Sequence, residues 1–334
     1  MTDRISDVGI SRRGFCAAMG AGALAASLPK SAFGASRGVV AATGLDAYHV
    51  PYAVAARHKL FEKYGLTLEY KPFDDGSVSL DALLTGGAHL GSASEVAGLT
   101  RWGKTKAIFI AGTVASASKL HAVVANASIK KPQDLLGKTV AFPKFSGGHY
   151  FFNTFAKRHA LPIEEIKTVQ VAAPETIAAM QRGDIDAFFL WEPWPSRAVE
   201  LVEGAHVLAW AEDLDLKFTT MSYYSKPLVE DHELAVAVTK GLIDAADFCQ
   251  NDPKETAKVV SEAFRIAPED AVRFVNNLTY RIEMDKNTLL PDLVDYADFC
   301  LEAGLINEMP DWDEFLRPDI MRDAAPDRLI GWQL

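Results

Sequence analysis

The sequence predicts an α/β fold of two lobes, each a mostly parallel sheet flanked by helices. Two stretches, residues 39–92 and 139–189, share one order of elements: strand, loop, helix, strand, helix, glycine turn and strand. This order is a βαβαβ unit, and such units form parallel sheets. Because ligands bind outside the carboxyl ends of parallel strands, two such lobes joined by crossing strands should leave a binding cleft between them.

The elements of the two units follow from local patterns. In the first unit, an apolar run with helical spacing ends at Gly65, and Gly86-Gly87 turns the chain into the last strand. In the second unit, Gly183 has the same place. The predicted strands are 39–41, 65–70, 88–92, 139–142, 166–171 and 184–189, and the predicted helices are 51–64, 79–84, 150–159 and 176–180.

Further strands are predicted at 107–114, 119–126 and 218–225, and the last of these is ended by Lys226-Pro227. From residue 233 the apolar spacing is helical, with Pro253, Pro268 and Pro291 marking helix starts. Strands 121–125 and 220–224 bracket the second unit and are the predicted hinge strands. We therefore expect residues 35–122 and 226–334 to form lobe one and residues 123–225 to form lobe two.

The first 34 residues predict an export signal. Arg12 and Arg13 precede a weakly apolar run, residues 16–28, and Ala32-Phe33-Gly34 offers small residues for cleavage near Gly34. This combination is typical of a twin-arginine signal peptide, which would take the chain through the twin-arginine translocase to the periplasm. The run is too short and too weakly apolar to span a bilayer. The alternative is an amphipathic helix at the start of a cytosolic protein.

The charge balance bears on the possible partners. The chain has a net charge of −10 with histidine neutral, and removal of residues 1–34 would leave about −12. Such an acidic protein is repelled by nucleic acid and by an anionic membrane, so we expect neither as a partner.

Polar and aromatic side chains follow the predicted strands, where they would face the cleft. Ser92-Ala93-Ser94 and Ser146-Gly147-Gly148 offer hydroxyls and N–H groups at helix N-termini, which suit an anion such as a sulfonate, although serine also caps helices. Trp191 lies in a proline-containing segment and suits a binding wall. The candidate ligand-binding residues are Asp46, Tyr48, His49, Ser92, Ser94, Glu95, Ser118, Ser146, Gly147, His149, Tyr150, Trp191 and Glu192.

Three of these candidates are acids. Asp46, Glu95 and Glu192 would repel a bare anion such as nitrate if they are ionised and close to it. A zwitterion such as an amino-sulfonate, or a basic heterocycle, fits better, and the aromatic candidates could hold a flat or cationic ligand. For Glu95 and Glu192, a structural role in capping a helix or bridging the lobes is the alternative.

Four segments occur in a specific order and spacing. They are Lys59-Leu60-Phe61-Glu62-Lys63-Tyr64-Gly65-Leu66, Asp134-Leu135-Leu136-Gly137-Lys138-Thr139-Val140-Ala141, Ser146-Gly147-Gly148-His149-Tyr150, and Gly183-Asp184-Ile185-Asp186-Ala187 with Trp191-Glu192-Pro193. Together they resemble the nitrate-, sulfonate- and taurine-binding proteins of ABC importers, whose architecture the thiamine-pyrimidine-precursor-binding proteins share.

The resemblance covers roughly residues 38–305. It implies the two-lobed type II periplasmic-binding-protein fold and a solute-binding component that closes by a hinge motion around a small molecule. The best-fitting ligand is an organosulfonate of the taurine type or a related organic acid, and a thiamine-type pyrimidine or another flat heterocycle is the alternative. The expected partners are an ABC permease and its ATPase, and we expect a monomer.

A secreted enzyme on the same fold is the remaining alternative. The eight histidines show no metal-binding spacing such as His-x-His, and no Gly-x-Ser-x-Gly elbow occurs. Cys249 and Cys300 follow no predicted cleft strand, which argues against a cysteine nucleophile. In an oxidising compartment they could form a disulfide, or they could be two buried free thiols. We therefore expect a binding protein without catalytic residues, metal or cofactor.

Overall fold

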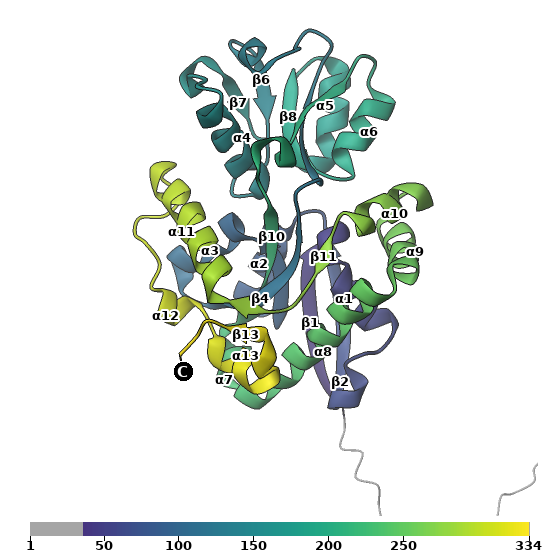
Figure 1. Ribbon diagram of the computed structural model, residues 1–334, viewed down its shortest axis with the longest axis vertical. Coiled ribbons are helices and arrows are strands. Elements are labelled where there is room, and N and C mark those ends of the chain that lie inside the picture. Colours follow the sequence, from purple (N-terminus) through teal and green to yellow (C-terminus); the bar gives the residue numbers. More distant parts are fainter. Residues whose placement is uncertain (1–35, 334) are drawn as a thin grey trace, which may run out of the picture. The chain divides into compact units, whose positions relative to one another are not determined.

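The computed structural model describes residues 36–333, so the predicted signal peptide lies outside the described residues. Two large sheets, one in each lobe, carry the fold (Figure 1). A small third sheet pairs β12 (Met284–Asp285) with β13 (Leu329–Ile330). No helix of the described residues is long and apolar enough to cross a membrane.

The first sheet has the strand order β11-β4-β10-β3-β1-β2. Its strands are β1 (Arg37–Gly44), β2 (Leu66–Phe73), β3 (Leu90–Ser94), β4 (Ile108–Ala117), β10 (Phe218–Ser225) and β11 (Thr279–Tyr280). Strand β1 pairs in parallel with β2 and β3, as the βαβαβ unit predicts. The other pairs, β10 with β3 and β4 and β11 with β4, are antiparallel, so the sheet is mixed.

The second sheet has the order β7-β6-β8-β5-β9. Its strands are β5 (His121–Ala125), β6 (Thr139–Ala141), β7 (Lys167–Val169), β8 (Ala187–Trp191) and β9 (His206–Trp210). The parallel trio β7-β6-β8 has the same arrangement as β2-β1-β3, which confirms the repeat. In both sheets, an antiparallel strand that enters from the other lobe, β10 or β5, lies next to the trio.

Helices of the two repeats cover these sheets. They are α1 (Val50–Arg57), α2 (Gly76–Leu84), α3 (Glu95–Thr105), α4 (Gly147–Arg158), α5 (Thr176–Arg182) and α6 (Trp194–Leu201). In the second lobe, Phe151, Phe155 and Phe189 are buried and meet edge to face between α4 and β8. This packing fixes α4 on its sheet, so the first turn of α4 has a defined position at the edge that faces the other lobe.

The strand pairing shifts the boundaries expected from the sequence. Strand β10 belongs to the first sheet, although residues 218–225 were expected in lobe two, and all of β5, including His121 and Ala122, belongs to the second sheet. The chain therefore crosses between the sheets in residues 118–120 and 211–217. The apolar pattern of a strand reveals that it is buried but not which sheet it joins, which is why the boundaries were misplaced.

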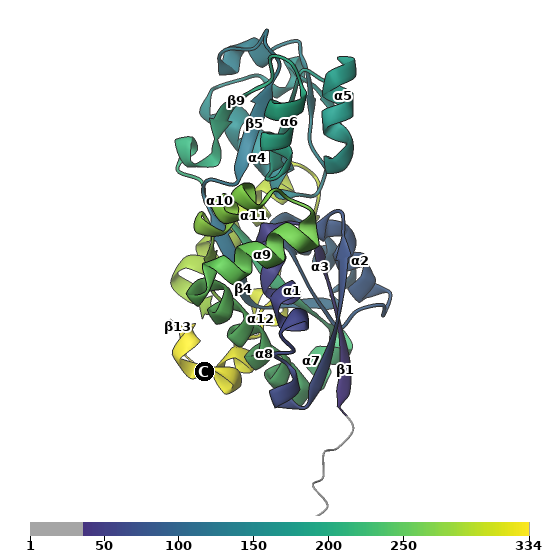
Figure 2. The same cartoon turned by 90° about the vertical axis from the view of Figure 1, so that its right-hand side faces the viewer.

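The C-terminal helices pack against the first lobe, as expected. They are α7 (Lys226–Glu230), α8 (His232–Asn251), α9 (Pro253–Phe264), α10 (Pro268–Asn276), α11 (Lys286–Glu302), α12 (Trp312–Phe315) and α13 (Pro318–Ala324). Helix α8 packs on α1 and α13. Figure 1 shows α8 near α13, and Figure 2 shows it near α1. Pro253 and Pro268 begin helices as predicted, whereas Pro291 lies inside α11, which starts earlier because Asp285 caps it.

Candidate functional site

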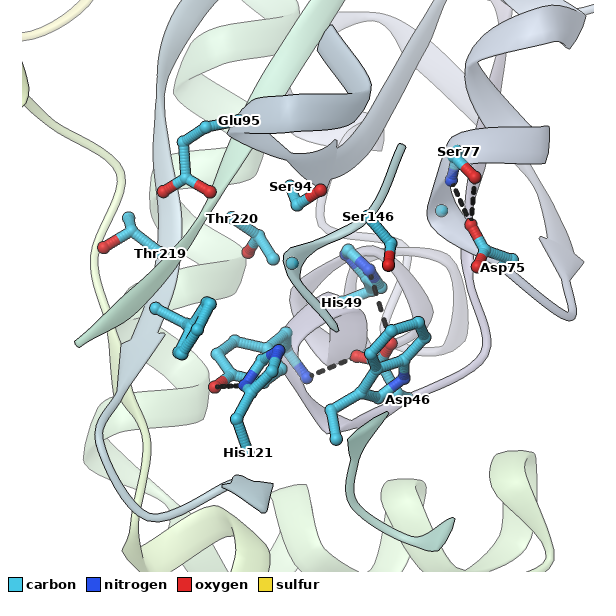
Figure 3. A pocket seen from close by; sticks show the side chains of 15 residues that line it. Asp46, His49, Asp75, Ser77, Ser94, Glu95, His121, Ser146, Thr219 and Thr220 are labelled. Atoms are coloured by element: carbon cyan, nitrogen blue, oxygen red, sulfur yellow. Dashed lines mark hydrogen bonds and ion pairs between the residues drawn. The ribbon is translucent and has the colours of Figure 1, made fainter. Parts of the chain in front are cut away.

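A narrow cavity lies between the two lobes (Figure 3). About 40 Å³ of it is open to the centre of a water molecule, so the cavity suits a small ligand. Its walls come from strand ends and helix N-termini of both lobes. The lining residues are Asp46, Tyr48, His49, Asp75, Gly76, Ser77, Ser94, Glu95, His121, Ser146, Gly147, Trp191, Phe218, Thr219 and Thr220.

Eight of the thirteen residues expected at the ligand from the sequence line this cavity. They are Asp46, Tyr48, His49, Ser94, Glu95, Ser146, Gly147 and Trp191. All lie at or after the carboxyl end of a strand of a βαβαβ unit, which is the position that the repeat predicts.

Asp46 and His49 form one wall. Asp46 follows β1 and caps the short 3-10 helix Ala47–His49 by accepting the Tyr48 N–H at 3.0 Å. The Nε2 of His49 lies 3.6 Å from an Asp46 carboxylate oxygen, and its Nδ1 lies 2.9 Å from the Ser92 hydroxyl. Burial raises the pKa of Asp46 and lowers the pKa of His49, and their mutual attraction opposes both shifts. Ser92 therefore orients His49 and does not itself line the cavity.

Glu95 is the first residue of α3 and is almost completely buried, with 1% of its surface exposed. Its Oε2 has no hydrogen-bond partner in the described residues. Burial raises the pKa of Glu95 to about 8, and the weaker opposing effects of backbone N–H groups and of Lys217 do not compensate. A buried carboxylate without a partner costs free energy when ionised, so this group is poised to receive a cation or to keep its proton.

Three helix N-termini meet at the cavity. Asp75 caps α2, Ser94 caps α3 and Ser146 caps α4, each by accepting a first-turn N–H with its side chain. The first turn of a helix has N–H groups without an intrahelical partner, and the helix dipole adds positive potential there. The ends of α3 and α4, which have neutral serine caps, therefore favour a negatively charged group in the cavity, whereas the Asp75 carboxylate offsets the positive potential at the end of α2.

Aromatic rings close the remaining side. The Tyr48 hydroxyl lies 3.2 Å from the Nδ1 of His121, whose ring stacks on Phe218 at a centroid distance of 3.7 Å. Trp191 lies 6.0 Å from His121 between ring centroids, and the two residues are partners in the β5–β8 pair. Burial lowers the pKa of His121 to about 3, so its ring is neutral and belongs to an apolar wall.

Sequence reasoning missed part of the lining: Asp75, Gly76, Ser77, His121, Phe218, Thr219 and Thr220. Asp75-Gly76-Ser77 follows β2, so the same rule that selected Asp46 would have selected it. His121 and Phe218 begin strands and do not end them, and such residues reach the cavity because β5 and β10 run antiparallel to their neighbours. Only the pairing reveals them.

Four further candidates do not line the cavity, mainly because their side chains point away from it. His149 and Tyr150 are in the first turn of α4, but they point away from Gly147: His149 stacks on Phe142, and the Tyr150 hydroxyl donates to Asp295. Glu192 follows Trp191, so its side chain points to the opposite side. Ser118 lies half-buried in a crossing segment.

Glu192 has the structural role that was the alternative for it. Its carboxylate accepts the Ser196 N–H at 3.1 Å, the Ser196 hydroxyl at 2.6 Å and the Nη1 of Arg273 at 3.1 Å. Arg273 is on α10, which packs with the first lobe, so this ion pair bridges the lobes.

Cys249 in α8 and Cys300 in α11 are buried free thiols. Neither Cys249 nor Cys300 lines the cavity, and burial raises the pKa of Cys300 to about 12, which keeps that thiol protonated. Within residues 36–333, no group of three or more His, Cys, Asp or Glu side chains could hold a metal ion. The cavity therefore presents no thiolate nucleophile from either of these cysteines.

Comparison with known proteins agrees with this architecture. The model of the NMT1-like family matches residues 38–264. The chain is 27% identical to the taurine-binding periplasmic protein of Escherichia coli over 275 residues, 77% of this chain and 84% of that protein. It is 26% identical to a putative aliphatic sulfonates-binding protein of the same organism, over 60% of this chain and 64% of that protein.

Among solved structures, the periplasmic aliphatic sulphonate binding protein of Escherichia coli has the same fold, with a TM-score of 0.73. The match covers 89% of this chain and 95% of that protein at 20% identity. The predicted two-lobed fold is thereby confirmed.

Proposed function

This chain belongs to the NMT1-like family, and we propose that it is the solute-binding component of an ABC importer that holds a small amino-sulfonate of the taurine type in the interlobe cavity. One observation carries the choice of ligand. The cavity combines the N-termini of α3 and α4, which favour an anion, with the buried Glu95 carboxyl, whose Oε2 lacks a partner. A ligand with a sulfonate at one end and an ammonium at the other satisfies both.

The sulfonate is assigned to the first turns of α3 and α4. Ser94 supplies a hydroxyl beside the N–H groups of these turns, whereas the hydroxyls of Ser77 and Ser146 donate to Asp75 and to the Pro143 carbonyl. Gly147 lets the backbone approach closely. Three sulfonate oxygens can accept several hydrogen bonds at once, which matches donors that converge from both lobes.

The ammonium is assigned to Glu95. Ionising this carboxyl in the empty cavity is unfavourable, as its raised pKa shows, and a cation at hydrogen-bond distance reverses that cost. Asp46 is a weaker candidate for this position, because it already contacts His49 and the Tyr48 N–H.

Transport requires that binding be coupled to closure. The cavity is lined from both lobes, so a ligand that contacts both favours the closed arrangement, which the permease and its ATPase would recognise. The taurine-binding relative and the sulphonate-binding protein of known structure are periplasmic, which supports the same location for this chain, with the twin-arginine route as the proposed means of export. We propose a monomeric binding protein.

A flat heterocycle is the second candidate ligand. The rings of Tyr48, His121, Trp191 and Phe218 on one side of the cavity favour it, because such rings can stack on a planar ligand. The small free volume of the cavity and the convergent helix N-termini favour the amino-sulfonate.

Isothermal titration calorimetry with four compounds tests the proposal. We expect taurine to bind, ethanesulfonate, which lacks the ammonium group, to bind at least roughly tenfold more weakly, and nitrate and a thiamine-type aminopyrimidine to bind weakly or not at all. Trp191→Ala should weaken taurine binding. Binding of the aminopyrimidine alone would show that the ligand is a flat heterocycle and not an amino-sulfonate. Turnover of any of the four compounds would point to an enzyme.

A further inference from the structure

Glu192 and Arg273 join the two lobes outside the cavity. Glu192 follows β8 of the second sheet, and Arg273 is on α10, which belongs to the first lobe. Arg273 also donates through Nη2 to the Ser196 hydroxyl at 2.8 Å and to Asp270 at 2.7 Å. A second hydrogen bond also joins the two lobes: the Arg197 side chain donates to the carbonyl oxygen of Arg265 at 3.0 Å.

This ion pair differs from an ordinary surface pair in its burial. The Glu192 side chain is 1% exposed, whereas that of Arg273 is 41% exposed. Exposed pairs contribute little to stability, but removing the cation from a buried carboxylate leaves a charge that water can no longer reach. Separation of the lobes would give that carboxylate access to water, so Arg273 stabilises the closed arrangement relative to the open one.

A second contact between the lobes lies on the other side of the crossing strands. The ring of Tyr150 on α4 packs against that of Tyr296 on α11 at a centroid distance of 4.1 Å, with the ring planes tilted by 41°, and the Tyr150 hydroxyl donates to Asp295. Figure 1 shows α10 and α11 on opposite sides of the crossing strands, each next to the second lobe. The two contacts therefore flank the cavity.

The chain order couples both contacts to the cavity. Trp191 lines the cavity and its neighbour Glu192 meets Arg273, while Gly147 lines the cavity and Tyr150, one turn later, meets Asp295. In the second lobe, the segments that contain Gly147 and Trp191 thus both line the cavity and contact a C-terminal helix of the first lobe. Closure of the lobes around a ligand would therefore form these two interlobe contacts at the same time.

We propose that Arg273 with Glu192, and Asp295 with Tyr150, form an interlobe clasp that sets ligand affinity without touching the ligand. The proposal rests on the proposed binding function. The clasp holds the lobes closed, and a ligand that binds the closed arrangement gains apparent affinity in proportion to the population of that arrangement. Loss of the clasp lowers affinity for every ligand by the same factor, because it changes the closure equilibrium and not the cavity.

The test uses Arg273→Met, Glu192→Gln, their double variant and Tyr150→Phe in the whole mature protein. Methionine keeps an apolar stem over Phe274, whose ring centroid lies 4.7 Å from the guanidinium carbon, and phenylalanine keeps the ring contact with Tyr296. The matched control is Arg57→Met, which breaks the pair between Arg57 and Glu262 within the first lobe. Calorimetry measures taurine and ethanesulfonate affinity, and small-angle X-ray scattering measures the radius of gyration with and without ligand.

We expect Arg273→Met and Tyr150→Phe each to weaken taurine binding by about tenfold, with the ratio of taurine to ethanesulfonate affinity unchanged. The double variant should lose no more than Arg273→Met alone, because both changes remove the same contact. The ligand-free variants should have a larger mean radius of gyration than wild type and reach the wild-type value when saturated, and Arg57→Met should change neither quantity.

Two results would overturn the clasp: an unchanged affinity together with an unchanged ligand-free radius, or a changed ratio between the two ligands, which would mean direct action on the ligand. If wild type binds neither sulfonate, the proposed ligand is wrong. The ligand-free scattering then still decides the clasp, because variants with the wild-type radius would refute it.

Discussion

Asp46 and Glu95 are two buried carboxyls of one cavity with opposite surroundings. Asp46 has His49 Nε2 at 3.6 Å and accepts a backbone N–H, whereas the Oε2 of Glu95 has no hydrogen-bond partner in the described residues. In Figure 3, dashed lines join Asp46 to its neighbours and none reaches Glu95. The two acids therefore differ in role: Asp46 orders one wall, and Glu95 is the carboxyl that we propose for the ammonium of the ligand.

Replacement of Glu95 by glutamine separates these roles. We expect Glu95→Gln to weaken taurine binding by about a hundredfold, or roughly 2–3 kcal/mol, because the amide cannot pair with the ammonium. The same change should stabilise the ligand-free protein at pH 8 by about 2 kcal/mol, because a buried ionisable group is removed. Calorimetry and urea unfolding measure the two effects, with Glu200→Gln at an exposed site as the control. Unchanged taurine affinity in Glu95→Gln would exclude the ammonium assignment.

The pH dependence of binding follows from the same carboxyl. Because burial raises the pKa of Glu95 to about 8, the ligand-free group is mostly protonated at pH 7, and pairing with an ammonium requires it to ionise. Binding should then release roughly 0.9 proton at pH 7, and affinity should rise as the pH goes from 6 to 8 and level off above it. Titrations in two buffers with different ionisation enthalpies measure the proton release, which Glu95→Gln should abolish. Binding without proton release would contradict this assignment.

The part of the site that follows from sequence is the part made by parallel strands. Asp46, Ser94 and Ser146 lie at or after the carboxyl ends of strands of the repeats and cap the helices that follow, so topology and capping preference both place them at the cavity. The remaining errors concern pairing and phase. His121 reaches the cavity only because β5 lies antiparallel beside β8, and Tyr150 leaves it because α4 turns by about 100° at each residue. The local pattern of a single sequence reveals neither which strand a given strand pairs with nor which side of a helix faces the cavity.

His121 should make the stability of the protein sensitive to acid. Its pKa is lowered to about 3 by burial, well below the ordinary value of 6.5, so between these values the unfolded chain binds a proton that the folded chain excludes. Stability therefore falls as the pH drops below 6.5, by roughly 2 kcal/mol between pH 7 and pH 5 from this residue alone. His121→Gln retains a hydrogen-bonding partner for Tyr48 and should lose that much less stability over this range.

Urea unfolding of wild type and His121→Gln at pH 5, 6 and 7 measures this difference. His206→Gln, at a ring nearer the surface of the same lobe, is the matched control and should follow wild type. Parallel curves for wild type and His121→Gln would show that His121 is protonated in the folded protein, against the neutral apolar wall described above.

Two glycines of β1 provide a matched test of how tightly the cavity wall is built. A Cβ added at Gly44 would lie 2.9 Å from the backbone nitrogen of Gly76 and 2.9 Å from the His49 ring, whereas a Cβ at Gly38 would meet nothing within 4 Å. Gly44→Ala must therefore push the N-terminus of α2 and His49 apart, at a cost of about 1–3 kcal/mol in unfolding free energy and with weaker ligand binding. Gly38→Ala, in the same strand, is the control and should change neither the unfolding free energy nor the ligand affinity. Urea unfolding and calorimetry measure the two quantities for both variants. If Gly44→Ala binds taurine with wild-type affinity, then His49 and the first turn of α2 do not contact the ligand as the cavity geometry implies.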